Sequence, residues 1–214
     1  MGTARKNKIV AFVALIAVMI LIMLTISMLL MARTLHDIIE NEALNISREL
    51  GEARLLLHFE DTNTETVARL TCCYKSVWQS LNRLDGLYRS FYPKAHREVR
   101  EHNSALLRVY SDLSEHLAVL PLDLEITDDG KTVQMLAADV TKSSYDIWSA
   151  HCNPQGHASD MSLKKIGAAC NEIHAELEAS LSAYCGEFWL NKNTSIFAYY
   201  DATDQYCNWE ELLY

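Results

Sequence analysis

The chain of 214 residues has little glycine and proline, and none of its first 36 residues is acidic. It contains only 7 Gly and 3 Pro. Sandwiches and small barrels need many turns, and turns rely on these two residues, so their scarcity argues against an all-β fold. Long segments with helical periodicity are present instead. We therefore expect an all-α protein.

The sequence also lacks the motifs of common enzyme active sites. It has no GxSxG elbow, P-loop or glycine-rich dinucleotide turn, and no CxxC or HExxH pair for zinc. His151, Cys152, His157 and Asp160 lie close in sequence but without ligand spacing, so we interpret them as part of a solvated loop. We predict no cofactor, no metal site and no enzymatic activity. An extracytoplasmic enzyme is an alternative.

Charge is distributed unevenly along the chain. All 28 acidic residues and 16 of the 19 Lys and Arg follow residue 32, so residues 33–214 carry a net charge of about −12. Nucleic-acid binders carry the opposite sign, and we predict no nucleic-acid partner. We expect the negative charge to favour solubility and to keep this part of the chain away from anionic lipid.

Residues 9–32 form an uncharged run of twenty-four residues. At about 1.5 Å per residue, a helix of this length crosses a hydrocarbon core of about 30 Å with some tilt. The run is longer than the apolar region of a signal peptide, and its exit, Leu29-Leu30-Met31-Ala32, lacks the small-x-small cleavage pattern. We therefore predict an uncleaved signal-anchor helix.

The charges on either side of the run predict its orientation. Arg5, Lys6 and Lys8 precede it, whereas the ionisable residues that follow it are Arg33, His36, Asp37, Glu40 and Glu42. Because positive residues stay in the cytoplasm, we expect a cytoplasmic N-terminus and an extracytoplasmic remainder, whether extracellular, luminal or periplasmic.

Apolar residues continue beyond the run at heptad spacing, at Ile39, Ala43, Ile46, Leu50, Ala53 and Leu57. This heptad seam predicts a stalk that extends the membrane helix and packs against the chain's own later helices or a second copy. Similar periodicity predicts helices over Val67–Phe91, Ala95–Leu120, Val133–Trp148 and Leu163–Phe188. Residues 122–127 alternate in polarity, and we interpret them as an extended linker.

Together these patterns predict an N-terminal transmembrane helix continuing into an antiparallel helical-bundle ectodomain stapled by disulfides. The expected parts are a cytoplasmic stub (1–8), the signal-anchor (9–32), the stalk (33–60), the bundle (61–190) and an aromatic C-terminal tail (191–214).

All six cysteines follow the membrane run: Cys72, Cys73, Cys152, Cys170, Cys185 and Cys207. An even number confined to this part predicts an oxidising compartment. If the helices alternate in direction, Cys152 pairs with Cys170 at the end nearer the membrane. Cys72 and Cys73 are then shared between Cys185 and Cys207 at the other end. Free buried thiols are the alternative.

Three further surface features are candidate sites. The tail carries aromatic residues that suit a partner interface or docking onto the bundle: Phe197, Tyr199, Tyr200, Tyr206, Trp209 and Tyr214. Asn45 and Asn193 begin sequons and are possible glycosylation sites. A cationic cluster, His96, Arg97, Arg100 and His102, is interpreted as an exposed charged face.

The sequence therefore suggests a single-pass membrane protein whose disulfide-bonded ectodomain binds a protein partner, as a subunit of a membrane or envelope complex. Its expected partners are the lipid bilayer and either another protein or a second copy through the stalk. A lytic or pore-forming effector regulated by its ectodomain is an alternative, which the lack of a GxxxG motif in the apolar run disfavours.

Overall fold

The computed structural model describes residues 2–59, 63–126, 130–152 and 162–185. Over these residues the chain is all-helical, as predicted, and its five helices are α1 (Gly2–Phe59), α2 (Thr64–Phe91), α3 (Pro93–His116), α4 (Val133–Cys152) and α5 (Leu163–Cys185). The chain divides into two compact units, Met1–Ile39 (unit 1) and Glu40–Tyr214 (unit 2).

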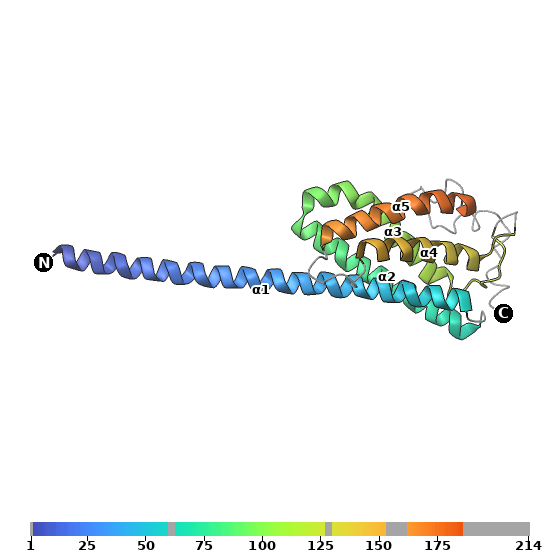
Figure 1. The fold of residues 1–214 in the computed structure, drawn as a ribbon, viewed down its shortest axis with the longest axis horizontal. Coiled ribbons are helices and arrows are strands. Elements are labelled where there is room, and N and C mark those ends of the chain that lie inside the picture. The colour runs from blue at the N-terminus through green and yellow to red at the C-terminus, as the bar shows by residue number, and fades with distance from the viewer. Residues whose placement is uncertain (1, 60–62, 127–129, 153–161, 186–214) are drawn as a thin grey trace. The chain divides into compact units, whose positions relative to one another are not determined.

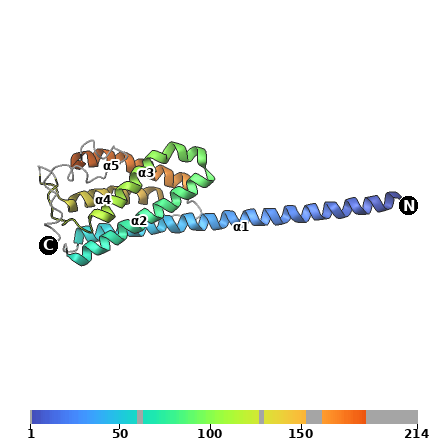
Figure 2. The same cartoon turned by 180° about the vertical axis from the view of Figure 1, so that it is seen from behind.

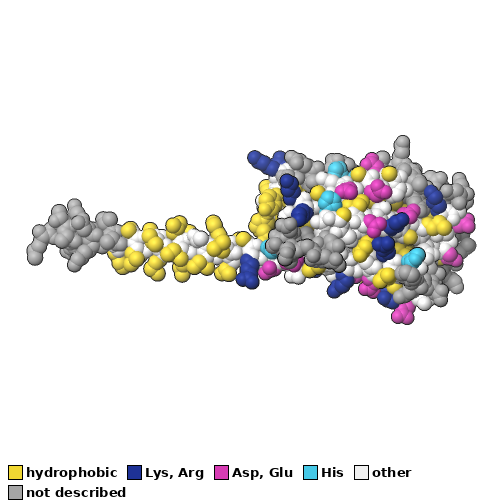
Figure 3. Space-filling view, in the orientation of Figure 1, with side chains coloured by type: hydrophobic (Ala, Val, Ile, Leu, Met, Phe, Trp, Pro, Cys, Tyr) yellow, Lys and Arg dark blue, Asp and Glu magenta, His cyan; other side chains and the backbone are white. Residues whose placement is uncertain are grey.

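Unit 1 is the N-terminal part of α1, and most of its described apolar side chains are exposed. From Phe12 to Met31 the large hydrophobic side chains are 42–72% exposed, and Figure 3 shows them covering the visible side of the helix. The Thr25 hydroxyl donates to the Leu21 carbonyl at 2.8 Å, which satisfies a polar group within the helix. The helix is long and apolar enough to cross a membrane.

The heptad seam of the second half of α1 is buried within unit 2. Ala43, Ile46, Leu50 and Ala53 are at most 1% exposed. The predicted seam continues at Leu57, but Leu57 is only half-buried. The buried residue in this turn is its neighbour Leu56. The seam residues therefore pack against the chain's own helices.

Within unit 2 successive helices run in opposite directions, as Figures 1 and 2 show. Two ion pairs set the antiparallel register of α1 and α2, Glu42 with Arg83 at 2.8 Å and Glu52 with Arg69 at 3.2 Å. The turn from α2 to α3 is short because Pro93 occupies the start of α3, where its fixed φ and missing N–H are tolerated.

The connection from α3 to α4 begins earlier than predicted, since α3 ends at His116 and the chain then turns. Leu117 and Leu120 remain buried, so their apolar pattern reflects packing of the turn and not continued helix. The predicted extended linker is only partly extended over its described residues: Leu122 and Asp123 form a turn, and Glu125 then makes an isolated antiparallel bridge with Thr132. Gly130 has φ of 79°, a conformation that favours glycine.

Polar side chains join the helices inside the core. The Tyr74 hydroxyl of α2 lies 2.7 Å from the Thr141 hydroxyl of α4. The Trp148 indole, 1% exposed, donates to the Ala43 carbonyl at 3.1 Å and ties α4 to α1. Because these buried groups find partners, the core gains polar contacts without a large desolvation cost.

The predicted disulfides are not supported among the described residues. Cys72, Cys73, Cys152 and Cys170 are all free, so the predicted Cys152–Cys170 bridge is wrong. His151 contacts Glu172 at 2.6 Å, so the two cysteines beside them are nearly level on α4 and α5.

Two cysteines at the same height on neighbouring helices do not necessarily form a disulfide. Packed helix axes lie about 8–10 Å apart, and a bridge needs Cα atoms within about 7 Å with the Cβ atoms facing each other. Cys152 and Cys170 instead fill the core as small apolar side chains, each buried. Cys72 and Cys73 were predicted to pair with Cys185 and Cys207. The side chain of Cys185 and all of Cys207 lie outside the described residues, so these pairings stay predictions.

Candidate functional site

A broad groove of about 1080 Å³ runs along the outer side of α1 in unit 2. We name it the α1–α4 groove. Its lining comes mainly from these two helices, with one residue of α2: Ser47, Arg48, Gly51, Glu52, Arg54, Leu55, Leu57, His58, Arg69, Ala138, Asp139, Lys142 and Tyr145. Eight of the thirteen residues lie on α1, on its outer face or along the flank of the buried seam, so the groove follows the polar side of this amphipathic helix.

The close approach of α1 and α4 at one wall depends on Gly51. A Cβ built at this position would lie 3.3 Å from Cε2 of Tyr145, a tight contact. The Tyr145 ring therefore rests against bare backbone. The Arg54 guanidinium lies 5.2 Å from the centre of the same ring and 3.2 Å from the Asp146 carboxylate. This wall is thus positioned by packing, a cation–π contact and an ion pair.

The charge of the groove is opposite to that of the rest of unit 2. Its lining includes four Lys and Arg side chains against the carboxylates of Glu52 and Asp139. Leu55 adds a hydrophobic side chain that is 56% exposed. A basic groove containing an exposed apolar residue suits an acidic, partly apolar protein segment better than a small neutral ligand.

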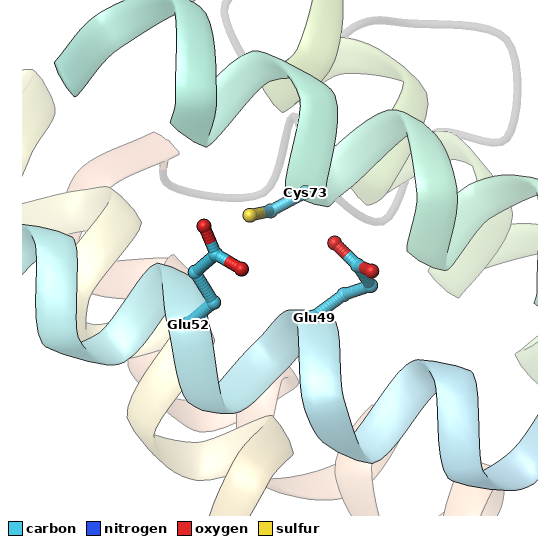
Figure 4. A group of neighbouring side chains, drawn as sticks. All are labelled: Glu49, Glu52 and Cys73. Carbon is cyan, nitrogen blue, oxygen red and sulfur yellow. The ribbon is translucent and has the colours of Figure 1, made fainter.

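Next to the groove, α1 presents Glu49 and Glu52 toward Cys73 of α2. Figure 4 shows both carboxylates pointing at the thiol. The three potential ligand atoms lie within 4.8 Å of one another, a grouping that could hold a divalent metal ion. Arg48 contacts Glu49 at 2.7 Å and Arg69 contacts Glu52 at 3.2 Å, so each carboxylate already has a cationic neighbour.

The chemistry of this cluster favours a protonated thiol. Burial, with the negative charges of Glu52 and Glu49 acting in the same direction, raises the pKa of Cys73 to about 12. At neutral pH the thiol therefore does not act as a nucleophile. The cluster resembles neither an acid–base pair nor a nucleophile with its base. Its members come from two helices, so their spacing in the sequence does not predict it.

The sites predicted from sequence are placed as follows. The aromatic tail residues Phe197 to Tyr214 and Asn193 lie outside the described residues. Asn45 is half-buried between α1 and α2, where its Nδ2 donates to the hydroxyls of Ser76 and Ser80 at 3.0 and 2.9 Å. A glycan is attached through this same nitrogen and leaves it a single hydrogen, so glycosylation of folded unit 2 would remove at least one of the two bonds.

The predicted cationic face on α3 is only partly exposed. Arg97 and Arg100 are exposed. His96 is 5% exposed, and its Nε2 lies 2.9 Å from the Asp85 carboxylate. The interpretation of both histidines as surface residues is wrong, because His102 also points inward and stacks on His174 of α5 with ring centroids 4.4 Å apart.

The histidine stack affects titration. Desolvation lowers the pKa of His174, and the neighbouring His102 lowers it further. The His102 Nδ1 lies 2.8 Å from Oδ1 of Asn171, which orients the ring. These contacts join α3 to α5 and indicate a structural role for the pair, since neither ring lines the groove.

Comparison of the chain with models of protein families, with curated proteins and with solved structures finds no significant match to any of them.

Proposed function

We propose that the chain is a single-pass membrane protein whose helical ectodomain binds a protein partner, as a subunit of a membrane or envelope complex. The observation that carries the proposal is the contrast in exposure along α1. Leu24 and Met28 are 54% and 72% exposed, whereas unit 2 completes its own hydrophobic core without them. Such an apolar surface in a soluble protein would be an aggregation hazard, and a bilayer removes it.

The orientation follows from the charges at the ends of the apolar run. Arg5, Lys6 and Lys8 lie before it, whereas Arg33 is the only Lys or Arg in the fifteen residues after it. The positive-inside rule then places unit 2 on the extracytoplasmic side. Protease added from the cytoplasmic side should leave residues 33–214 intact. Digestion of unit 2 from that side would reverse the orientation.

The α1–α4 groove is the surface proposed to bind the partner. The heptad seam is buried inside unit 2, so a second copy could use it only if the bundle opened. The groove, in contrast, is open and basic, and it presents Leu55 as an apolar anchor. Since a few anchor residues supply most of the energy of an interface, Leu55 should matter more than the charged rim.

The test is quantitative co-purification of the intact protein from membranes in mild detergent, comparing wild type with Leu55→Ser and with Lys142→Glu. We expect Leu55→Ser to weaken partner recovery by about 30-fold, the effect of losing an interface anchor of about 2 kcal/mol. Lys142→Glu should weaken it less and make it less sensitive to salt.

Two matched controls lie away from the groove. Val119→Ser removes a hydrophobic side chain that is 54% exposed, and Lys75→Glu reverses an exposed charge on α2. Neither should change recovery of the partner. Equal losses in groove variants and controls would overturn the groove as the binding surface. Release of dye from vesicles by the purified protein would instead favour a lytic effector.

A further inference from the structure

The turn between α2 and α3 has a composition unlike the rest of the acidic unit 2. Residues 86–97 contain three cations, Arg89, Lys94 and Arg97, and no carboxylate. The turn also presents two adjacent aromatic residues, Phe91 and Tyr92, which are 45% and 53% exposed. At this end of unit 2, Figure 3 shows hydrophobic side chains beside Lys and Arg side chains.

The turn is held firmly by contacts behind it. The Tyr92 N–H donates to the Tyr88 carbonyl at 2.8 Å, and the two rings lie 6.0 Å apart. Tyr88 also meets His96 edge-on at 6.1 Å, and His96 is fixed to Asp85. Phe91 and Tyr92 are therefore exposed on an ordered support, so their exposure does not result from a loosely packed turn.

The register of α1 and α2 locates this turn along unit 2. Arg83 is level with Glu42, and Phe91 lies eight residues further along α2. At about 1.5 Å per residue, the turn extends about 12 Å beyond Glu42 in the direction of the N-terminal end of unit 2. Glu40 lies about 3 Å from Glu42 in the same direction, so the turn extends about 9 Å beyond Glu40.

The chain itself limits how far this end of unit 2 can lie from the bilayer. Glu40 follows the last residue of the apolar run, Ala32, by eight residues of continuous helix. It therefore lies within about 12 Å of Ala32, whatever the angle between the two units. If α1 of unit 2 stands along the bilayer normal, the projection of the turn beyond Glu40, about 9 Å, and a headgroup layer roughly 5–8 Å thick together span that distance.

We propose that the α2–α3 turn is a second membrane contact, which inserts Phe91 and Tyr92 among phospholipid headgroups while Arg89 and Lys94 bind their phosphates. Aromatic rings favour the headgroup level, and basic side chains near a bilayer surface bind its phosphates. The proposal rests on the membrane anchor proposed above. It gives unit 2 a fixed face toward the bilayer, although its net charge is negative.

The experiment uses the full chain in vesicles of phosphatidylcholine and phosphatidylglycerol that contain a trace of a phospholipid with a photoactivatable diazirine headgroup. After illumination, mass spectrometry maps the lipid adducts on the protein. We expect adducts on residues flanking the apolar run and on residues 86–97. Phe91→Ser combined with Tyr92→Ser should reduce adducts at the turn about five-fold or more, as should Arg89→Glu combined with Lys94→Glu.

Val119→Ser is the matched control, because Val119 is 54% exposed and follows the far end of α3. It should leave the adducts unchanged, and thermal unfolding should show that all variants remain folded. Adducts beside the apolar run without adducts at the turn would overturn this inference and leave the anchor standing. Absence of both would overturn the anchor. Turn adducts that persist in both double variants would show that these side chains do not make the contact.

Discussion

The two halves of α1 have similar helical geometry and opposite surfaces. In unit 1 apolar residues occupy every face, and Leu21 and Leu29 are 65% and 66% exposed. In unit 2 they occupy one face, and Ile46 and Leu50 are 1% exposed while Arg48 and Arg54 point outward. The difference shows that the distribution of apolar residues around a helix, more than their number, indicates whether lipid or protein covers it.

The largest expected effect is on the protein-covered half. Ile46→Asp places an unpaired carboxylate in the core and should destabilise unit 2 by more than about 4 kcal/mol, with membrane retention preserved. Thermal unfolding in detergent and sedimentation with membranes measure the two properties. Leu55→Asp, at an exposed position of the same helix, is the control and should change stability by about 0.5 kcal/mol or less. Equal effects of the two variants would remove the distinction between the faces.

The reciprocal change is made in the lipid-covered half. Leu24→Arg lies near the middle of the apolar run and should disfavour insertion by about 3 kcal/mol. We expect a larger fraction of the protein in the soluble phase after carbonate extraction, with the unfolding temperature of unit 2 unchanged. Leu24→Ile keeps the apolar character and is the control. A loss of unit 2 stability in Leu24→Arg would mean that the two halves of α1 are not independent.

A smaller effect tests whether the membrane contributes to the stability of unit 2. Asn63 caps α2, and its Oδ1 accepts from the Thr66 N–H at 2.9 Å. Asn63→Ala should cost about 1 kcal/mol, or an unfolding temperature lower by roughly 2–4 °C, in detergent and in bilayers alike. Asn63→Asp retains an equally good cap and should behave as wild type. A cost that appears in only one environment would show that lipid contributes to the stability of the bundle.

The smallest expected effect is a pH dependence confined to unit 2. Because the pKa of His174 is lowered in the fold, the unfolded chain binds more protons as the pH falls below the ordinary histidine value of about 6.5. The stability contributed by neutral His174 is therefore present above that pH and lost as the pH falls through the folded pKa. His174→Gln should flatten the fall of the unfolding temperature below neutral pH, while membrane retention stays constant.

The matched control is His36→Gln, which removes a histidine from unit 1. The neighbours of His174 include Glu178 and Arg108 as well as His102, and Glu178 acts against the shift. An unfolding temperature whose pH dependence is the same in wild type and His174→Gln would show that the stacked pair does not supply it.

Periodicity was sufficient to predict the helices and the buried seam, because both depend on residues close in sequence. Ala43, Ile46, Leu50 and Ala53 are buried as predicted. Local signals were less reliable at helix ends: α2 begins at Thr64, with Asn63 as its cap, although the periodicity predicted a start at Val67, and α3 ends at His116 although apolar spacing continues to Leu120. A buried turn needs apolar residues as a helix does, so apolar spacing can continue beyond the end of the helix.

Features that join separate helices could not be predicted from spacing. Cys152 and Cys170 were placed at the same level, but level alone does not fix the distance and direction that a disulfide requires. The groove and the cluster around Cys73 depend on how far apart helices pack, which neighbours in sequence do not encode. His96 appeared to belong to a charged surface because its partner, Asp85, is eleven residues away on another helix.

The contact between Gly51 and Tyr145 has a consequence for how this sequence can change over evolution. The ring lies tightly against the place where a side chain at position 51 would begin, with 3.3 Å between Cε2 and a built Cβ. A larger residue at 51 is therefore compatible with the same helix spacing only if the ring at 145 shrinks or moves. In related sequences these two positions should vary together, with glycine accompanying an aromatic residue and a bulkier residue accompanying a smaller partner.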